Sequence, residues 1–489
     1  MPIASAKLAQ AASGFTLDDT ARALIALLSG GGDARIALDP EMGLNRYLSA
    51  PYPRDVTAYA SSTANDISAS AFAFLQEQGV PADYGAALDA VRARIRHAYG
   101  LAEDVGIVFA PSGTDLEYVA LYLAASKSGA GVHNMLLGAD EVGSGCIHSA
   151  HGRYFAEETA LGFAVKPKQV VEGLDDVSLT DIPLRCLEGK VRSSAAIAEH
   201  VRQEIGIAAM DGRQALLHIV HGSKTGLILP SPDDIDALRA EYHDRLSLVI
   251  DACQARITSA AIGEYLARDA IVFLTGSKFM GGPPFSGFAL VPPALMGDVP
   301  PLPSGFAQIF RRAEWPHNWS GADYLDDSAN MGLALRLSAS IFELERFGLI
   351  SPQRVATIIT AFRSAVLGEI IEPLGLNIVE PSDDSEHAEW REHPIEMQSL
   401  ITVDVSNLSG MQTFDQAQAV HKAMAASGLR LGQSVKSLRT NAGEWAGTLR
   451  IGLSMPQITD WAAMSEAEFA ADLTADMAKV AEALKAHSA

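Results

Sequence analysis

The sequence predicts an α/β protein, in which a large domain with a mostly parallel sheet flanked by helices is followed by a smaller α+β domain. From about residue 86, short apolar segments alternate with amphipathic helical segments, a pattern typical of a parallel sheet with helical crossovers. The apolar segments are almost uninterrupted, as expected of strands buried on both faces. The chain has 489 residues, 48% hydrophobic and 20% charged, so it is long enough for a composite protein and too apolar for a disordered one.

The elements of the large domain follow from this alternation. Strands are predicted at Gly106 to Ala110, Met135 to Gly138, Ala215 to Val220, Leu246 to Ile250, Ile271 to Thr275 and Gly287 to Val291. Helices are predicted at Leu116 to Ala125, Ser194 to Glu204, Pro232 to Tyr242 and Ala255 to Ala267. Upstream, acidic residues after Thr16 and the apolar residues Ala21, Leu24, Ile25 and Leu28 predict a capped amphipathic helix.

Three regions are expected along the chain: an N-terminal helix and arm at 1–85, the large domain at 86–330, and a linking helix with the small domain at 331–489. The last region should contain a helix from Asn330 to Phe347 and strands at Leu400 to Val405 and Thr448 to Gly452. The Pro- and aromatic-rich stretch from Asn45 to Arg54 is predicted to be an ordered loop, either at the substrate entrance or in a structural arm. Asp383 to His393 is predicted to be a solvated loop.

Charge and cysteine content argue against several classes of protein. Lys and Arg number 37 against 59 Asp and Glu, and this net charge of −22 predicts that nucleic acid is repelled. Cys146, Cys186 and Cys253 are too few and scattered for a disulfide framework or a C-x-x-C metal site, so we expect no metal and a cytoplasmic location. No segment approaches the roughly 20 apolar residues of a membrane helix, so no membrane partner is expected.

The first candidate for chemistry is the turn Ser112-Gly113-Thr114, which follows a predicted strand and precedes a helix. Gly113 permits a tight turn, the hydroxyls of Ser112 and Thr114 can donate, and the first N–H groups of a helix favour an anion. A phosphate could bind there. An ordinary turn that caps the helix is the alternative interpretation.

Two further segments end neighbouring predicted strands with charged residues. Asp251 follows an apolar strand, at the edge where open α/β sheets assemble their sites, although a helix N-cap is an alternative role. Lys278 follows another strand in a Gly-rich turn, and one helix with a returning strand would bring it to the same edge. A phosphate cradle, a carboxylate for a ring nitrogen and an amine for an aldehyde are what pyridoxal 5'-phosphate requires.

These segments resemble the fold-type I pyridoxal phosphate enzymes, particularly the class V aminotransferase and cysteine desulfurase-like group. The resemblance covers roughly residues 85–345 and extends more weakly to the C-terminal domain. Asp251-Ala252-Cys253-Gln254 is similar to the group's Asp-Ala-x-Gln, which implies Asp251 at the pyridine nitrogen and Gln254 near the phenolic oxygen. Thr275-Gly276-Ser277-Lys278 is similar to its Ser-x-His-Lys, which implies Lys278 as the Schiff-base lysine. Thr275 and Ser277 would then lie near the phosphate, with Ser277 where the pattern usually has His.

The resemblance also implies roles for further residues around the cofactor. Ser223 stands at the position of the group's Asn, where its hydroxyl could reach a cofactor oxygen, and a simple glycine turn is an equal alternative. A stacking ring is expected just after the strand that ends near Gly138. His148 and His151 are the candidates, although Glu141 or Val142 aligns nearest that place and capping or core roles suit either histidine equally well.

The candidate for binding a substrate carboxylate is Arg450, which lies in an apolar strand and resembles the group's C-terminal arginine. Arg430, Arg439 and Arg54 are competitors, and Asn45 belongs to the same proposed entrance as Arg54. The resemblance also implies a homodimer whose two subunits share each active site.

The residues favour a small amino acid as substrate and an aminotransferase as the enzyme, because a lysine, an electron sink and a carboxylate clamp suffice for aminotransfer. Lyase, decarboxylase or aldol chemistry would use the same cofactor and stays open. Cysteine desulfuration is disfavoured, because it needs a mobile cysteine in the small domain and all three cysteines lie at or before residue 253. The alternative to an enzyme is a protein that binds the cofactor without catalysing a reaction.

Overall fold

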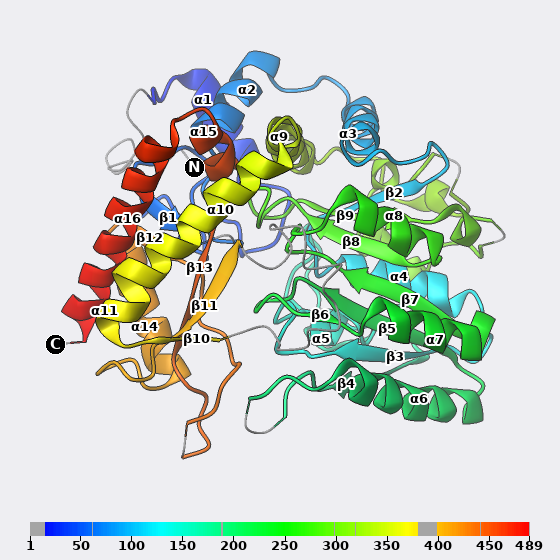
Figure 1. Ribbon diagram of the computed structural model, residues 1–489. Helices are drawn as coiled ribbons and strands as arrows, with labels where there is room; N and C mark the ends of the chain where they lie inside the picture. The colour runs from blue at the N-terminus through cyan, green and yellow to red at the C-terminus, as the bar shows by residue number, and fades with distance from the viewer. Residues whose placement is uncertain are drawn as a thin grey trace.

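The predicted α/β class is confirmed by the computed structural model, which contains a mostly parallel sheet flanked by helices (Figure 1). The structure describes residues 15–488 except residues 61, 187–188, 298, 318, 380–398 and 441. The solvated loop predicted at Asp383 to His393 therefore lies outside the described residues.

A large sheet forms the right-hand half of the molecule in Figure 1. Its strands are β2 (Gly106–Ala110), β3 (Val132–Leu137), β4 (Val177–Ile182), β5 (Gln214–His221), β6 (Ile228–Leu229), β7 (Leu246–Asp251), β8 (Ile271–Thr275) and β9 (Gly287–Val291). Their order is β2-β9-β8-β7-β5-β3-β4, with β6 paired to β5. Neighbouring strands from β4 to β8 are parallel, whereas β9 is antiparallel to both β8 and β2. The carboxyl ends of β7 and β8 therefore reach the same edge.

Helices cover both faces of this sheet, and the strand residues alternate between the two cores. On one face lies α4 (Leu116–Ala125), which packs over Val249 of β7 and Phe273 of β8. The other face is covered by α6 (Ser194–Met210), α7 (Pro232–Tyr242) and α8 (Ser259–Ala267). Short helical segments complete this region at α5 (Cys146–Ser149), His243–Arg245, Pro293–Leu295, Ser304–Gln308, Arg312–Glu314 and Ala322–Tyr324.

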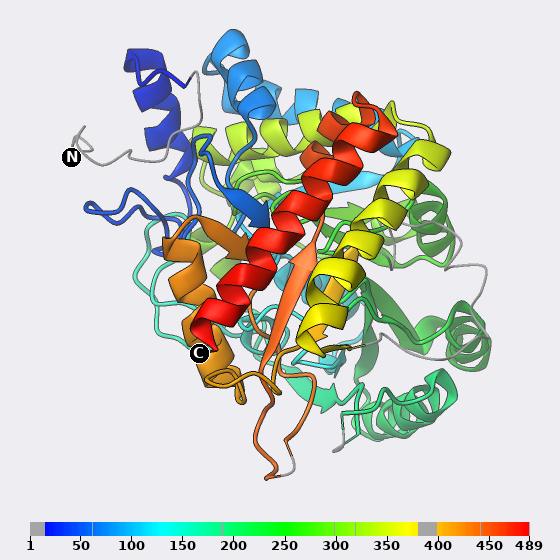
Figure 2. The same ribbon diagram turned by 60° about the vertical axis from the view of Figure 1, so that its left-hand side comes forward.

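A smaller three-stranded antiparallel sheet lies beside the large one (Figure 1). Its order is β10 (Asn377–Ile378), β11 (Leu400–Asp404), β13 (Thr448–Gly452). The surrounding helices are α9 (Met331–Gly348), α10 (Pro352–Val366), α11 (Glu372–Leu374), α14 (Phe414–Ala426), α15 (Met455–Ala462) and α16 (Glu466–His487), with a π-helical turn at Leu367–Ile371. Figure 2 shows α10 and α16 side by side across this half, and the apolar residues of both helices belong to one core.

The N-terminal segment joins both halves. It contains α1 (Asp19–Leu28), β1 (Thr57–Tyr59), α2 (Ala69–Gln78) and α3 (Tyr84–Tyr99). Strand β1 pairs in parallel with β12 (Leu429–Leu431) near the other end of the chain. The N-terminal region is thus part of the structure around the small sheet, and the division at residues 85 and 330 stays a prediction.

Most predicted elements occur with small shifts of their ends. Four of the strands and two of the helices have the predicted bounds, whereas the strand predicted from Met135 begins at Val132. The helix predicted from Ala255 begins at Ser259, because Thr258 accepts a hydrogen bond from the Ala261 N–H and caps it there. Similarly, Asp18 rather than Thr16 caps α1, whose four predicted apolar residues are all buried.

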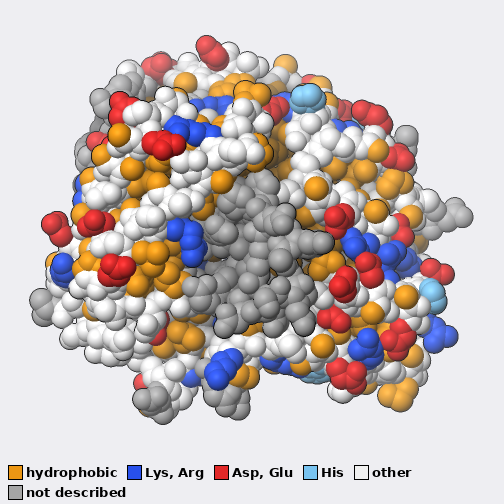
Figure 3. All heavy atoms as spheres, in the orientation of Figure 1, with side chains coloured by type: hydrophobic (Ala, Val, Ile, Leu, Met, Phe, Trp, Pro, Cys, Tyr) orange, Lys and Arg blue, Asp and Glu red, His pale blue; other side chains and the backbone are white. Residues whose placement is uncertain are grey.

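The described surface carries acidic, basic and hydrophobic side chains interspersed on the face that Figure 3 shows. None of the helices in the described part of the chain combines the length and apolar character needed to cross a membrane.

Candidate active site

The turns that follow β2, β7 and β8 meet at one edge of the large sheet. A Cβ atom on Gly113 would lie 2.8 Å from Cγ2 of Thr275 and 3.1 Å from Sγ of Cys253, so this approach of the three turns requires a glycine. The N–H of Phe279 donates to the carbonyl of Gln254 at 3.2 Å. The structure therefore brings together the three segments that the sequence nominated.

The turn after β2 is organised by Asp115. Ser112 Oγ donates to Asp115 Oδ2 at 2.6 Å, and burial raises the pKa of Asp115 to about 6 against the opposing effect of this hydrogen bond. The side chain of Asp115 stands at the N-cap position of α4 without making a cap hydrogen bond. The Asp115 N–H donates to the Ser112 carbonyl at 3.2 Å, so the segment is an ordinary turn, but its N-cap residue makes no side-chain cap bond. Ser112 and Thr114 are both buried.

Asp251 is the last residue of β7 and its carboxylate is partly exposed. Its Oδ1 accepts a hydrogen bond from the Cys253 N–H at 2.9 Å. The following helix α8 begins at Ser259 with Thr258 as its cap. The helix-capping alternative for Asp251 is therefore wrong, and its carboxylate stands at the sheet edge.

Behind Asp251 lies a buried pair that the sequence interpretation missed. His218 Nε2 and Glu117 Oε1 are 2.9 Å apart, and both side chains are almost inaccessible to solvent. The register pairs Asp251 with Phe273, whose ring meets the His218 ring edge-to-face, so Asp251 and His218 share the sheet face beneath α4. Burial opposes protonation of His218, but the charge of Glu117, the hydrogen bond to it and the charge of Asp251 together outweigh burial and raise the His218 pKa. The available signal was that Glu117 and His218 each stand between apolar neighbours in the chain.

Lys278 follows β8 in a tightly packed turn and is partly exposed. Its carbonyl accepts a hydrogen bond from Asn65 Nδ2 at 2.8 Å, which ties the N-terminal arm to the site. Thr275 Oγ1 donates to the Cys253 carbonyl at 2.7 Å, and Ser277 is buried. Among the described residues no carboxylate lies within 4.0 Å of the Lys278 ammonium, so this lysine has no ion pair there.

The charges of Asp251 and Lys278 act on the same two thiols. Both influence Cys146 and Cys253, whose pKa values are raised well above the usual range mainly by burial. The two charged residues are therefore close in space as well as at one sheet edge. Cys146 belongs to the segment after β3, so this segment also reaches the site.

Gln254 is held by a buried arginine. Its Oε1 accepts a hydrogen bond from Arg256 Nη1 at 2.9 Å, and the same guanidinium donates to Ser399 Oγ and the Leu453 carbonyl. Arg256 also stacks over Phe279, 4.9 Å from the ring centre. The orientation of Gln254 is thus fixed from the side of the small sheet.

Ser223 belongs to a network centred on Glu141. Ser223 Oγ donates to Glu141 Oε2 at 2.7 Å, Arg185 Nε forms an ion pair with Oε1 at 3.1 Å, and Thr225 donates from its N–H and its hydroxyl. The carboxylate of Glu141 is consequently saturated by partners. The sequence placed Glu141 nearest the stacking position, and here it organises the loop that contains Ser223.

The two candidate stacking histidines have other described neighbours. Burial lowers the pKa of His148, and the charges of Lys168 and Arg153 lower it further. For His151, burial and Arg153 act in the same direction. No described contact joins either ring to Asp251 or Lys278, so their stacking role stays a prediction.

Arg450 lies in β13 and points from the small sheet toward the large one. Its Nε donates to the Gln433 carbonyl at 2.9 Å, and its Nη1 lies 3.5 Å from the Lys224 carbonyl in the loop after β5. Burial lowers the pKa of Arg450 to about 10. Arg450 therefore spans the junction between the halves.

The competing arginines and Asn45 are engaged elsewhere. Arg54 and Arg430 both bind Asp66, at 3.0 and 2.8 Å. Arg439 stacks on Trp445, 3.3 Å from the ring centre. Asn45 exchanges hydrogen bonds with Ser49 within the arm.

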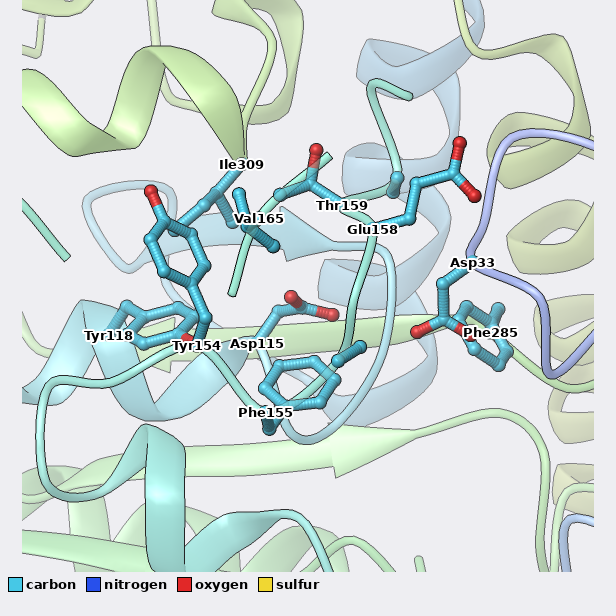
Figure 4. A pocket seen from close by; sticks show the side chains of 12 residues that line it. Asp33, Asp115, Tyr118, Tyr154, Phe155, Glu158, Thr159, Val165, Phe285 and Ile309 are labelled. Atoms are coloured by element: carbon cyan, nitrogen blue, oxygen red, sulfur yellow. The ribbon is translucent and has the colours of Figure 1, made fainter. Parts of the chain in front are cut away.

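A separate pocket lies beside the Ser112 to Asp115 turn (Figure 4). Asp33, Asp115 and Glu158 line it together with the rings of Tyr118, Tyr154, Phe155 and Phe285. Arg35 pairs with Asp33 at 2.7 Å, and its guanidinium lies 5.0 Å from the Phe155 ring centre and 4.6 Å from that of Phe285. Arg35 thus already supplies a cation to these acidic and aromatic groups.

Comparisons with known proteins identify the fold. Neither a protein-family profile nor a curated protein sequence matches this chain. Among solved structures, it is similar to ureidoglycine-glyoxylate aminotransferase from Bacillus subtilis, with 14% identity, 89% of this chain and 94% of that chain covered, and a TM-score of 0.53.

Two more solved structures give the same picture. Pyridoxamine-pyruvate aminotransferase from Mesorhizobium loti has 17% identity, coverage of 89% and 98%, and a TM-score of 0.50. Cysteine desulfurase from Thermococcus onnurineus has 14% identity, coverage of 87% and 95%, and a TM-score of 0.53. The protein therefore has the aspartate aminotransferase-like fold, fold type I, that these aminotransferases and this desulfurase share.

Proposed function

We propose that the protein is a pyridoxal phosphate-dependent enzyme acting on a small amino acid, with aminotransfer as its reaction. The observation that carries this proposal is the meeting of Asp251, Lys278 and the Gly113 turn at one sheet edge. Pyridoxal phosphate, when bound, supplies an electron sink for the bonds at the substrate's α-carbon.

The residues at this edge fit that cofactor. The absence of a Cβ atom at Gly113 lets the turn at the start of α4 pack closely against Thr275 and Cys253, and the N–H groups at a helix start suit a phosphate. The Asp251 carboxylate suits a protonated ring nitrogen. The buried His218–Glu117 pair lies behind it on the same face of the sheet. Lys278, without a carboxylate partner among the described residues, is the amine available to hold an aldehyde.

The remaining residues position the substrate and the proton. Lys278 Nζ, once the substrate amine replaces it on the cofactor, would accept a proton from the substrate's α-carbon and donate it to a carbon of the cofactor. Arg450 would bind the α-carboxylate through its guanidinium from the side of the small sheet. Gln254, fixed by Arg256, would orient the cofactor ring from its amide.

The test is the absorbance of the purified protein with added pyridoxal phosphate. We expect a yellow protein whose imine absorbance disappears in Lys278→Ala and persists in Lys190→Ala, which removes an exposed lysine. A wild-type protein that stays colourless with excess cofactor would refute the proposal.

A second experiment separates the reactions that share this cofactor. The holoenzyme is mixed with single amino acids without a keto acid. Stoichiometric conversion of the cofactor to its amine form indicates aminotransfer. Continuous release of carbon dioxide, ammonia or an aldehyde indicates a lyase or decarboxylase instead.

Cysteine desulfuration is the second candidate, because a solved desulfurase shares the fold. It needs an accessible thiol, and of the three cysteines only Cys186 is exposed, beside the Arg185 that pairs with Glu141. Sulfide or persulfide formed from cysteine, and lost in Cys186→Ala, would favour desulfuration over aminotransfer.

A homodimer is part of the same proposal. The mass of the protein in solution tests it, since a dimer of the 51.8 kDa chain is readily distinguished from the monomer. A monomer with full activity would exclude a site shared between subunits.

A further inference from the structure

Two cations converge at the junction between the large and small sheets. Arg450 comes from β13, and its Nη1 lies 3.5 Å from the carbonyl of Lys224, in the loop after β5. The Lys224 N–H donates to the Glu141 carbonyl at 2.9 Å, and its Nζ donates to the Asp140 carbonyl at 3.0 Å. The backbone of Lys224 therefore lies beside the guanidinium, and its side chain is held by the Asp140 carbonyl.

These two cations also neighbour the proposed catalytic centre. The charge of Lys224 acts on Cys146, as do the charges of Lys278 and Asp251. Arg450 and Lys278 in turn act on Lys224. Cys146 thus lies within the electrostatic reach of both lysines, and Lys224 occupies the side of the site that faces Arg450.

The nearby anion does not neutralise this pair. The charge of Glu141 acts on both cations, but its carboxylate already binds Arg185, Ser223 and Thr225. Within the described residues neither Arg450 nor Lys224 has a carboxylate within 4.0 Å. Arg450 is buried and Lys224 is partly buried, so a ligand with two negative groups would stabilise both cations by pairing with them.

We infer that the substrate is a dicarboxylic amino acid, with Arg450 binding its α-carboxylate and Lys224 its side-chain carboxylate. This inference rests on the proposed function and adds the class of substrate. The ammonium of Lys224 has three hydrogens and uses one for Asp140, so two remain to donate to a carboxylate. The compact ammonium and the planar guanidinium thus offer two separate anion-binding points.

Binding of two acids and their amides to the holoenzyme tests this inference. Aspartate, asparagine, glutamate and glutamine are titrated at pH 7, and the change in cofactor absorbance gives each apparent dissociation constant. We expect one acid to bind about 10-fold or more tightly than its amide, because a charged hydrogen bond is lost in the amide. Equal or tighter binding of both amides, or no response to any of the four, would overturn the inference.

Variants of Lys224 identify its ligand. Lys224→Met should remove the preference for the acid and leave amide affinity within about twofold, whereas Lys224→Arg should keep the preference. Lys422→Met, on the exposed face of α14, is the control and should behave as wild type. If Lys224→Met weakens cofactor binding and lowers acid and amide affinity equally, Lys224 serves the cofactor and the inference is wrong.

Different results would contradict the cofactor proposal and the inference about the substrate class. A protein that never develops imine absorbance contradicts the cofactor proposal and, with it, the substrate class. A holoenzyme with that absorbance but no acid preference leaves the cofactor proposal intact and overturns only the inference. Lys224→Gln, which keeps a polar side chain, replaces Lys224→Met if the latter fails to fold.

Discussion

Lys224 illustrates how a single residue acquires its properties from its surroundings. Burial lowers the pKa of its ammonium to about 8, and the positive charges of Arg450 and Lys278 contribute, while Glu141 acts in the opposite direction. Four groups face it from other elements: Arg450 on β13, Glu141 after β3, Cys146 on α5 and Lys278 after β8. A lysine with such a pKa changes charge within the range where enzymes are assayed.

Affinity for the dicarboxylic amino acid should consequently depend on pH. Below pH 8 Lys224 is protonated and attracts the side-chain carboxylate, and above it the charge is lost. The ratio of acid affinity to amide affinity should therefore fall about 10-fold between pH 7 and pH 9.5. Because the acid and its amide both contain the α-amino group, this ratio cancels the effect of titrating that group. Lys224→Arg should hold the preference constant, since an arginine stays protonated. A wild-type preference that is flat over this range would contradict the assignment.

At this scale, sequence reasoning identified residues that end apolar strands. Asp251 and Lys278 stand out because a charge at the end of an apolar run is costly without a partner or a function. Lys224 was not singled out, because its neighbours in the chain are polar and its contact with Arg450 joins positions over 200 residues apart. Glu117 and His218 stand among apolar neighbours in the chain, but their pairing was missed because only the packed sheet brings α4 onto β5.

Among the elements, the turn after β8 and helix α9 are packed without spare room. A Cβ atom on either Gly276 or Gly282 would fall inside van der Waals contact with Ser340 of α9. Ser340 Oγ donates to the Arg336 carbonyl within the helix, so its position is fixed. Helix α9 therefore packs directly against the turn containing Lys278.

Gly276→Ala should therefore destabilise the protein by about 1–3 kcal/mol through overpacking. Adding Ser340→Gly should recover part of this loss despite the roughly 1 kcal/mol cost of a glycine within a helix. Denaturant unfolding of both single variants and the double variant measures the coupling. Gly263→Ala in α8, where nothing lies within 4 Å, is the control and should be neutral or stabilising. Additive losses would show that the two residues do not clash.

Burial and length separate the elements that the sequence predicted from those that it missed. Strands β2, β8 and β9 are buried throughout and were predicted with their observed bounds. Strand β4 at the sheet edge is largely half-exposed and contains polar residues, so no apolar run marks it. Strands β1 and β12 have three residues each, too few for a periodic pattern.

Across the whole molecule, Asp66 connects the N-terminal arm with the C-terminal half. Its carboxylate binds Arg54 of the arm and Arg430 of β12, whose side chains are 5% and 1% exposed. Two hydrogen bonds reinforce this connection, from Tyr59 Oη to Asp476 Oδ2 and from Gln457 Nε2 to the Ala58 carbonyl, both at 2.8 Å. The arm thus holds together parts of the chain that are distant in sequence.

Removing the charge of Asp66 should be costly. Asp66→Asn leaves two buried guanidinium groups without their anion, and we expect a loss of about 3 kcal/mol in the free energy of unfolding. Asp55→Asn removes an exposed carboxylate from the same arm and should change stability by less than about 0.5 kcal/mol. Equilibrium denaturation at pH 7 compares the two. Equal effects would show that Asp66 contributes no more than a surface charge.

The parallel pairing of β1 with β12 has a consequence for how the chain is assembled during synthesis. Thr57 is aligned with Leu429, so this pair closes a loop of about 370 residues. All strands of the large sheet lie between Gly106 and Val291, so that sheet has its strands as soon as β9 has left the ribosome. The earlier-made strand β1 must wait for its partner until about 370 further residues have been synthesised, which leaves its backbone edge unpaired in the nascent protein.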